Sequence, residues 1–141
     1  MIRVKIVKKN KNKQKENEDS EMVAKIVIVD AENRVLMLVR SDFHNKYPGE
    51  LDLPGGHIKK NENILKGLLR EVKEETGLVV DNPIFYKQSE RKYFYYTKYN
   101  SQPIKLSNEH KDFMFLDEKD LKSSDKFQKI ALEVIGILKN G

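Results

Sequence analysis

The 141-residue chain contains no cysteine, and this absence excludes several kinds of chemistry. Without thiols, the protein can form no disulfide framework, hold no metal through thiolates and use no cysteine nucleophile. The absence fits a reducing compartment, where disulfides are rare. The length is enough for one hydrophobic core. We therefore expect a single domain over residues 1–141, without covalent cross-links.

Long hydrophobic runs are also missing from the chain. No apolar run approaches the roughly 20 residues that a membrane-spanning helix needs. The first five residues, Met1-Ile2-Arg3-Val4-Lys5, lack the apolar core of a signal peptide. These two features predict a soluble, cytoplasmic protein with no membrane partner.

Acidic residues are absent from the first 15 positions, which hold seven of the 27 Lys and Arg residues. The net charge of +5 is therefore concentrated in this segment, and the rest of the chain is slightly acidic. Residues 8–19 are polar throughout and predict a Lys-rich loop. The basic segment is either a solvated loop or a region that attracts phosphate-rich partners such as RNA through nonspecific electrostatics.

Alternating or β-branched apolar runs, separated by turn residues, predict several short strands. A polar turn at residues 30–33 lies between two of them and indicates a hairpin. Residues 40–50 read as irregular, and Leu53-Pro54-Gly55-Gly56 reads as a sharp turn. The strands are predicted at residues 2–7, 22–29, 35–39, 78–80, 84–87, 91–99, 104–106 and 112–116.

The first of two predicted helices lies in the middle of the chain. It is expected to begin near Asn61 or Glu62, with Asn61 or Asn63 as its N-cap. It is expected to end near Thr76, because Gly77 fits the left-handed position that stops a helix.

A second helix is predicted at the C-terminal end, with Ser123 or Ser124 as its cap.

Gly67 lies in the middle of the first predicted helix, where a glycine lowers helix stability by about 1 kcal/mol relative to alanine. A side chain there would crowd a ligand or a loop, or else the helix packs closely against another backbone. Mixed strands with two helices indicate a sheet with helices on its faces. The apolar residues of the second helix, all assigned to the core, are Phe127, Ile130, Ala131, Val134 and Leu138.

The most informative segment runs from Gly56 to Leu78, where glycines, an arginine and glutamates stand at fixed spacing. Glu71, Glu74 and Glu75 occupy positions i, i+3 and i+4, which fall on one side of a helix. Like charges this close repel one another, unless the face is solvated or a divalent cation lies between them. Hard cations such as Mg²⁺ take a few carboxylate ligands and complete their shell with water and phosphate oxygens.

This segment resembles the Nudix box, the signature of the Nudix hydrolases. The pattern is Gly, five residues, Glu, seven residues, Arg-Glu-apolar-x-Glu-Glu-x-Gly-apolar, and every specified position is filled. A looser resemblance extends from about Met22 to Leu138. It implies an α/β protein with the Nudix fold, an α/β/α sandwich around a mixed sheet. It also implies hydrolysis of a phosphoanhydride bond in a nucleoside diphosphate linked to another group, with Mg²⁺ as cofactor and Mn²⁺ as the alternative.

The resemblance assigns roles to the polar residues of the box. Glu74 and Glu75 match the principal metal-binding pair. Glu71 matches the third helix carboxylate, which is a ligand or a water-orienting group depending on the relative. Arg70 matches the arginine that holds these carboxylates in place, and it can pair with Glu74 one turn later. Glu62 matches a glutamate that fixes the loop before the helix.

Residues outside the helix complete the site that the resemblance implies. Gly55 and Gly56 form the loop where backbone groups contact metal or phosphate. Glu109 is the candidate for a further glutamate from a loop before a late strand, as a metal ligand, a general base or an exposed loop charge. His57 and His110 are expected to be incidental surface groups.

The substrate class is the least specified part of the resemblance. Tyr95 stands where relatives acting on dinucleoside polyphosphates carry a tyrosine, and it either stacks on a base or packs the sheet. The proline typical of relatives acting on ADP-ribose is replaced by the run Tyr93-Phe94-Tyr95. Leu51 replaces a frequent tryptophan, which weakens the case for a base-stacking platform there.

Three functions therefore stay open. The first is hydrolysis of nucleoside triphosphates or dinucleoside polyphosphates. The second is removal of a 5′ pyrophosphate or cap from RNA. The third is a non-catalytic nucleotide sensor with the same fold.

Overall fold

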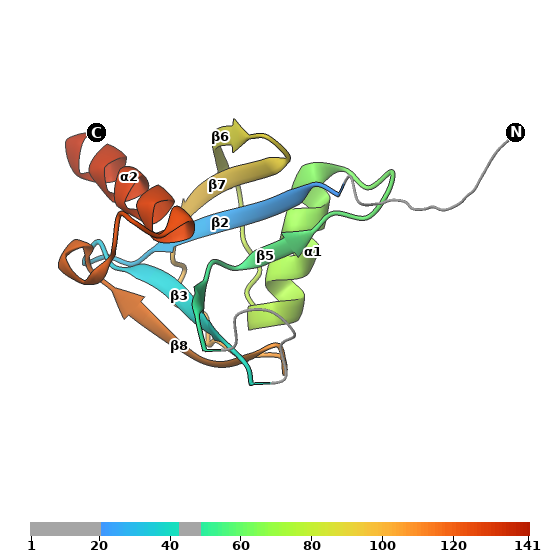
Figure 1. Ribbon diagram of the computed structural model, residues 1–141, viewed down its shortest axis with the longest axis horizontal. Helices are drawn as coiled ribbons and strands as arrows, with labels where there is room; N and C mark the ends of the chain where they lie inside the picture. Colours follow the sequence, from blue (N-terminus) through green and yellow to red (C-terminus); the bar gives the residue numbers. More distant parts are fainter. Residues whose placement is uncertain (1–20, 43–48) are drawn as a thin grey trace, which may run out of the picture.

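The computed structural model describes residues 21–42 and 49–141, which form one mixed β-sheet and two long helices (Figure 1). The strand predicted at residues 2–7 and the loop predicted at residues 8–19 lie outside the described residues. Within the described part, the sheet has seven strands in the order β4-β3-β2-β7-β6, with β5 paired to β2 and β8 paired to β3. These strands are β2 (Val23–Val29), β3 (Val35–Arg40), β4 (Leu51–Asp52), β5 (Gly55–His57), β6 (Ile84–Ser89), β7 (Lys92–Lys98) and β8 (His110–Leu116).

Strand β2 is the centre of the sheet and makes it mixed. It runs parallel to β7, in a register that pairs Val23 with Lys92 and Val29 with Lys98. It runs antiparallel to β3 and β5. Parallel neighbours need a long crossover, and the crossover between β5 and β7 includes the central helix.

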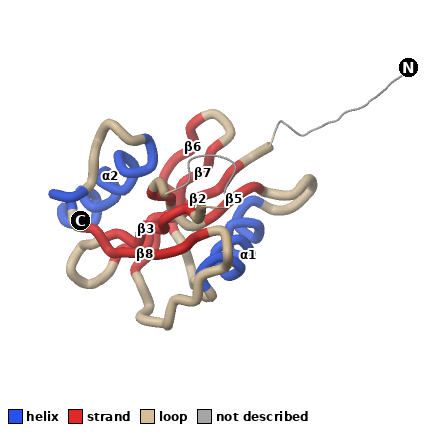
Figure 2. Tube along the Cα trace, turned by 60° about the horizontal axis from the view of Figure 1, so that its bottom comes forward, coloured by secondary structure: helices blue, strands red, loops and turns tan. Residues whose placement is uncertain are grey.

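The two helices cover opposite faces of the sheet, as the views in Figures 1 and 2 show. Side chains of β2 alternate between the faces. Ile26 and Ile28 pack in one apolar cluster with α1 (Ile64–Thr76), and Val27 and Val29 pack in the other with α2 (Lys126–Asn140). The predicted α/β/α sandwich around a mixed sheet is confirmed.

Helix α1 begins later than predicted and ends where predicted. Asn63 is the N-cap, and its side chain accepts a hydrogen bond from the backbone N–H of Lys66 at 3.0 Å. Gly77 is the C-cap with a left-handed φ of 76°. Both ends therefore use the residue types that satisfy unpaired helix termini.

Several predicted elements were wrong in detail. Residues 78–80 and 104–106 are not strands. The second segment instead binds the end of α1, since the N–H of Lys105 donates to the carbonyl of Thr76 at 2.8 Å. Gly55 and Gly56 belong to a short strand rather than to a turn alone. Helix α2 is capped by Asp125, and not by Ser123 or Ser124.

Neither helix in the described part of the chain combines the length and the apolar character that a membrane crossing demands.

The cap of α2 gives a first testable prediction. Asp125→Ala should lower the free energy of unfolding by about 1 kcal/mol, because the Gln128 N–H, now 3.0 Å from the Asp125 carboxylate, loses its acceptor. Ser124→Ala is the matched control and should change stability by much less. Urea unfolding of the two variants decides the matter, and equal losses would contradict Asp125 as the cap.

Candidate metal and catalytic site

The glycine pair of β5 brings the sheet against α1. Gly55 has a φ of 121°, and a Cβ atom there would lie 2.2 Å from the carbonyl oxygen of Ala24. A Cβ at Gly56 would lie 2.6 Å from a carboxylate oxygen of Glu71. Only glycine fits at both positions without displacing these neighbours. The result is that backbone and helix carboxylates approach one another closely.

The three carboxylates of α1 lie at different depths. Glu75 is 4% exposed and accepts a hydrogen bond from the Gly55 N–H at 3.0 Å. Burial raises the pKa of Glu75 to about 8, although Lys25 and the Gly55 N–H oppose the rise. Glu71 is partly buried, and burial raises its pKa against the opposing effect of Arg70. Glu74 has a 59% exposed side chain.

Arg70 connects these carboxylates to the loop before the helix. Its Nε and Nη2 donate to the two carboxylate oxygens of Glu62 at 2.8 and 3.0 Å. Its Nη1 also donates to Glu71 at 3.1 Å and to Glu74 at 3.3 Å. Glu62 in turn accepts from the Lys59 N–H at 2.9 Å. The two-point contact with Glu62 is the strongest geometry available to a guanidinium and a carboxylate.

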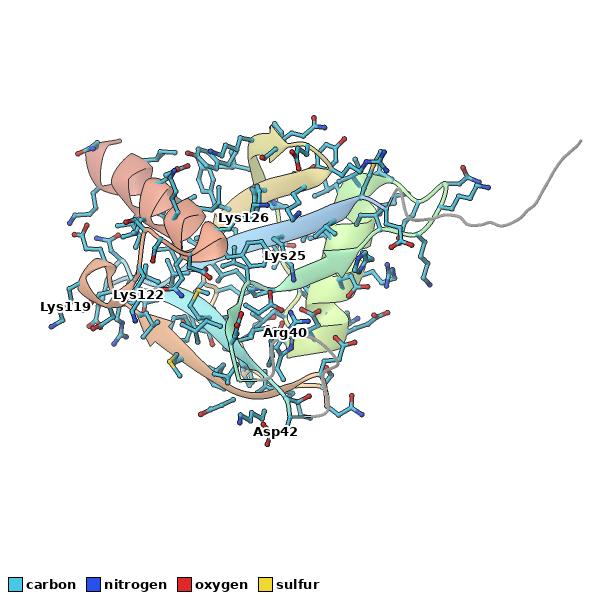
Figure 3. The ribbon with its side chains drawn as sticks, viewed as in Figure 1. Lys25, Arg40, Asp42, Lys119, Lys122 and Lys126 are labelled. Carbon is cyan, nitrogen blue, oxygen red and sulfur yellow. The ribbon has the colours of Figure 1, made fainter. Side chains whose placement is uncertain are left out.

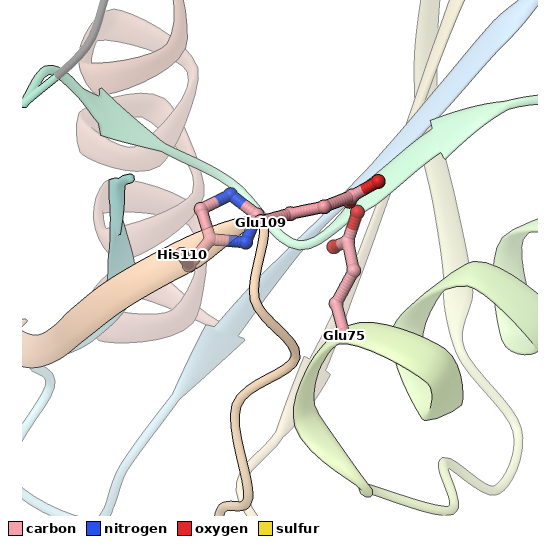
Figure 4. Close-up of side chains that lie close together, drawn as sticks. All are labelled: Glu75, Glu109 and His110. Carbon is pink, nitrogen blue, oxygen red and sulfur yellow. The ribbon is translucent and has the colours of Figure 1, made fainter. Parts of the chain in front are cut away.

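The loop before β8 brings Glu109 to the same place. The N–H of Ser107 donates to the backbone carbonyl of Glu75 at 3.1 Å, and the N–H of Ser41 donates to the carbonyl of Glu109 at 2.9 Å. The side chains of Glu75, Glu109 and His110 each offer a ligand atom within 4.8 Å of the others (Figure 4). Glu109 is exposed, so this group of side chains is open to solvent on one side.

A buried ionic cluster lies behind these side chains. We call it the Asp52 cluster, and it consists of Lys25, Arg40, Asp52 and His110. The Asp52 carboxylate accepts from Lys25 at 3.1 Å and from Arg40 at 3.0 Å, and it contacts His110 Nε2 at 3.0 Å. Figure 3 labels Lys25 and Arg40, which come from the neighbouring strands β2 and β3.

The charge of Asp52 is stabilised by these partners. Burial alone would raise the pKa of Asp52, but the hydrogen bond with His110 and the charges of Lys25 and Arg40 outweigh burial, so the pKa is lowered. Lys25 uses its remaining donors on the carbonyls of Leu53 at 3.1 Å and Gly55 at 2.9 Å. The cluster therefore fixes the chain on both sides of Pro54.

The expectation that His110 is an incidental surface group was wrong, because its side chain is 1% exposed. His57 is 70% exposed, as expected. Sequence reasoning also missed Lys25 and Asp52. The sequence did contain a sign of these buried residues, which is a single charge within an apolar run. Lys25 stands among valines and isoleucines, and Asp52 stands between two leucines. A charge in such a run needs a buried partner.

Tyr95 packs among apolar side chains of the sheet, whereas the site residues described above make charged and polar contacts. It is on β7, one strand beyond β2, and its ring meets Phe85 edge-on at 5.4 Å. It packs in the apolar cluster beneath α1. For Gly67, a Cβ would lie 2.7 Å from Ile58 and 2.9 Å from Glu62. The side chains of the preceding loop therefore account for that glycine.

These side chains fit a divalent cation. Glu71, Glu74, Glu75 and Glu109 offer carboxylate oxygens, the ligand type that Mg²⁺ and Mn²⁺ prefer. The carboxyl of Glu75 is held beside Gly55 even though burial disfavours its charge. A bound cation would offset that cost by favouring the ionised form.

The sequence model of a protein family, the NUDIX domain, matches residues 20–135 of this chain. The chain belongs to the Nudix family. This match covers the sheet, α1 and the loop before β8, so the family assignment extends over the whole group of acidic side chains described above.

Three curated Nudix relatives share a shorter segment. An ADP-ribose pyrophosphatase from Methanocaldococcus jannaschii is 36% identical over 52 residues, which cover 37% of this chain and 30% of that protein. Nudix hydrolase 6 from Arabidopsis thaliana is 43% identical over 56 residues, which cover 40% of this chain and 20% of that protein. The m7GpppN-mRNA hydrolase NUDT17 from Xenopus laevis is 38% identical over 53 residues, which cover 38% of this chain and 18% of that protein. The chain thus matches less than a third of the length of each relative.

Solved structures match a larger share of the chain. The MutT protein from Methanosarcina mazei Go1 is similar with a TM-score of 0.65 and 21% identity, over 86% of this chain and 96% of that one. A C. elegans Ap4A hydrolase is similar with a TM-score of 0.66 and 19% identity, over 86% and 98%. At these identities the likeness establishes the fold.

The Arg70–Glu62 contact predicts a pH-dependent contribution to stability. Hydrogen bonds from Arg70 and from the Lys59 N–H lower the pKa of Glu62 from its ordinary 4.5 to about 2. A carboxyl with a depressed pKa stabilises the fold above its unfolded pKa, and this stabilisation is lost as the pH falls through the folded pKa. Glu62→Gln should therefore lower the Tm at pH 7, with the difference from wild type shrinking between pH 4.5 and pH 2.

Thermal unfolding followed by circular dichroism over that pH range tests this expectation. Glu32→Gln is the control, because the Glu32 side chain forms an exposed pair with Arg34. A Tm difference for Glu62→Gln that stays constant down to pH 2 would contradict the assignment.

Burial of Glu75 predicts a conflict between stability and metal binding. A raised pKa gives stability at low pH that is lost as the pH rises from 4.5 toward about 8. In buffer with EDTA at pH 7, Glu75→Gln should increase the free energy of unfolding by about 1–3 kcal/mol, because a neutral amide removes this cost and its oxygen can still accept from Gly55. Urea unfolding measures the change.

Glu74→Gln is the control for that experiment, since Glu74 is exposed. It should change the stability little. A Glu75→Gln variant that is less stable than wild type without metal would show that the carboxylate is not under this strain.

Proposed function

We propose that this protein is a divalent-cation-dependent pyrophosphohydrolase that cleaves a phosphoanhydride bond in a nucleoside diphosphate linked to another group. The observation that supports this most directly is the meeting of two distant segments. Glu75 at the end of α1 and Glu109 before β8 offer ligand atoms within 4.8 Å of each other. Glu71 and Glu74 lie on the same side of the helix. Mg²⁺ is the proposed cofactor, and Mn²⁺ is the alternative.

Bound cations would neutralise the phosphate charge and lower the pKa of the attacking water. The chain supplies the positioning. Glu74 and Glu75 are the proposed principal ligands, with Glu71 as a third ligand or a water-orienting group. Arg70, tied to Glu62, holds α1 against the loop. Its contacts with four acidic and carbonyl groups indicate a positioning role rather than contact with substrate.

Two further groups complete the proposal. Gly55 and Gly56 present backbone atoms to the metal or the phosphates. Glu109 is exposed and acts as a ligand or as the general base that takes a proton from water. The proposed substrates are nucleoside triphosphates or dinucleoside polyphosphates. Tyr95 is the proposed base-stacking residue, although its packing against Phe85 also explains its position.

A second candidate function is removal of a 5′ pyrophosphate or cap from RNA. It is favoured by the similarity to an m7GpppN-mRNA hydrolase over 53 residues and by the seven basic residues among positions 1–15. Basic residues that neutralise RNA phosphates make binding salt-dependent. Deletion of residues 1–15 should then weaken RNA binding at low salt while leaving cleavage of small nucleotides unchanged.

The proposal is tested by product analysis. The protein is incubated with Mg²⁺ or Mn²⁺ and a panel of nucleoside triphosphates, ADP-ribose, dinucleoside polyphosphates and 5′-triphosphorylated RNA, and the products are separated by chromatography. We expect metal-dependent cleavage of one class. Glu74→Gln should reduce the rate by about 100-fold or more, since even residues supporting a metal site are worth up to that much.

Glu32→Gln is the control for the substitution, because Glu32 lies in the turn between β2 and β3 with an exposed side chain. Its rate should equal that of wild type. Nucleotide binding without any product would overturn the hydrolase proposal for this panel and support the sensor. An equal loss of cleavage rate in both variants would show that Glu74 has no specific role in the reaction.

A further inference from the structure

Among the described residues, one ring nitrogen of His110 is buried and has no hydrogen-bond partner. The side chain is 1% exposed, and Nε2 lies 3.0 Å from the carboxylate of Asp52. The other ring nitrogen, Nδ1, has no partner in the part of the chain that the structure describes. Buried polar atoms are nearly always paired, so an unpaired one needs an explanation. Leaving it unpaired costs the desolvation of that atom without a compensating hydrogen bond.

The contact with Asp52 determines which nitrogen is available. An ionised carboxylate only accepts hydrogen bonds, so Nε2 carries the proton and donates it. In the neutral ring, Nδ1 then holds a lone pair. Because Nε2 is used by Asp52, which Lys25 and Arg40 also contact, Nδ1 is the ring nitrogen that remains for a further partner.

The neighbours of His110 are metal-ligating groups. A ring nitrogen of His110 and carboxylate oxygens of Glu75 and Glu109 all lie within 4.8 Å of one another. Figure 4 shows the carboxyl ends of Glu75 and Glu109 meeting, with the His110 ring beside them. Metal-bound histidines usually donate their second N–H to a carboxylate, which fixes the ring orientation. Asp52 has that position here.

We propose that His110 is a metal ligand through Nδ1, oriented by Asp52, in a cation site shared with Glu75 and Glu109. This site contains one nitrogen and carboxylate oxygens, in contrast to the all-oxygen set of the α1 glutamates. Imidazole ligands favour first-row transition metals over Mg²⁺, which keeps oxygen ligands and water. The site therefore selects Mn²⁺, Co²⁺ or Zn²⁺ over Mg²⁺. The inference deepens the proposed function, since it concerns the cofactor of the same acidic group.

Nitrogen coordination is tested directly on the wild-type protein. Mn²⁺ is added at less than one equivalent, and electron spin-echo envelope modulation is recorded. We expect nitrogen modulation from a directly bound imidazole, and we expect it to be absent in His110→Gln. This readout does not require turnover, and a histidine with a purely structural role would not produce it. Absence of nitrogen modulation in the wild type would overturn the inference without the use of any variant.

Metal selectivity gives a second, independent measurement. The Kd of Mn²⁺ is measured from the free-ion electron paramagnetic resonance signal, and the Kd of Mg²⁺ is measured by competition. His110→Gln should weaken Mn²⁺ binding by at least about 10–100-fold, the loss typical even of groups that only orient a ligand, while changing Mg²⁺ binding far less. His57→Gln is the matched control, since His57 is 70% exposed and should leave both constants unchanged.

The outcomes separate this inference from the proposed function. Equal weakening of Mn²⁺ and Mg²⁺ binding in His110→Gln would mean that His110 only supports the fold, and it would overturn the inference. Nitrogen-coordinated Mn²⁺ in a protein that cleaves none of the panel would uphold the inference and reject the hydrolase. Cleavage of a substrate with Mg²⁺, together with no nitrogen coordination of Mn²⁺, would uphold the hydrolase and overturn the inference.

Discussion

The ion pairs of Asp52 are the interaction on which the rest of the site depends. A lone buried carboxylate is very costly, and it persists only with close partners that satisfy its lone pairs. Asp52 has three of them, Lys25 from β2, Arg40 from β3 and His110 from β8, each at 3.0–3.1 Å. These contacts join three strands to the short β4. They therefore determine where the chain leaves β4 to reach the glycine pair.

The acidic group in front of this cluster is held together against its own repulsion. Arg70 neutralises part of the charge at the exposed end, where it contacts Glu62, Glu71 and Glu74. At the buried end, burial raises the pKa of Glu75 to about 8 even though the charge of Lys25 and the hydrogen bond from the Gly55 N–H lower it. Ionising the buried Glu75 carboxylate therefore costs stability. Strongly shifted pKa values of this kind cluster at functional sites.

The hydrogen bonds at the C-terminal end of α1 satisfy the helix end and also position Glu109. Its last carbonyls lack partners within the helix, and the N–H groups of Lys105 and Ser107 satisfy those of Thr76 and Glu75. The same contacts bring Glu109 beside the carboxylate of Glu75. Closing the helix end and completing the acidic group are therefore consequences of one set of hydrogen bonds.

The sequence by itself determined the features that depend on local spacing. The glutamates of α1 share a side because a helix has a fixed period, and Gly77 ends the helix because it adopts a left-handed φ of 76°. The order of strands and helices indicated a sheet with helices on its faces, and the resemblance to the Nudix family implied the sandwich. Only the tertiary structure decided the Asp52 cluster, because its hydrogen-bonded partners are 27 and 58 residues apart in the chain. Burial of His110 has the same origin: whether an imidazole meets water or a carboxylate depends on which distant strand packs against it.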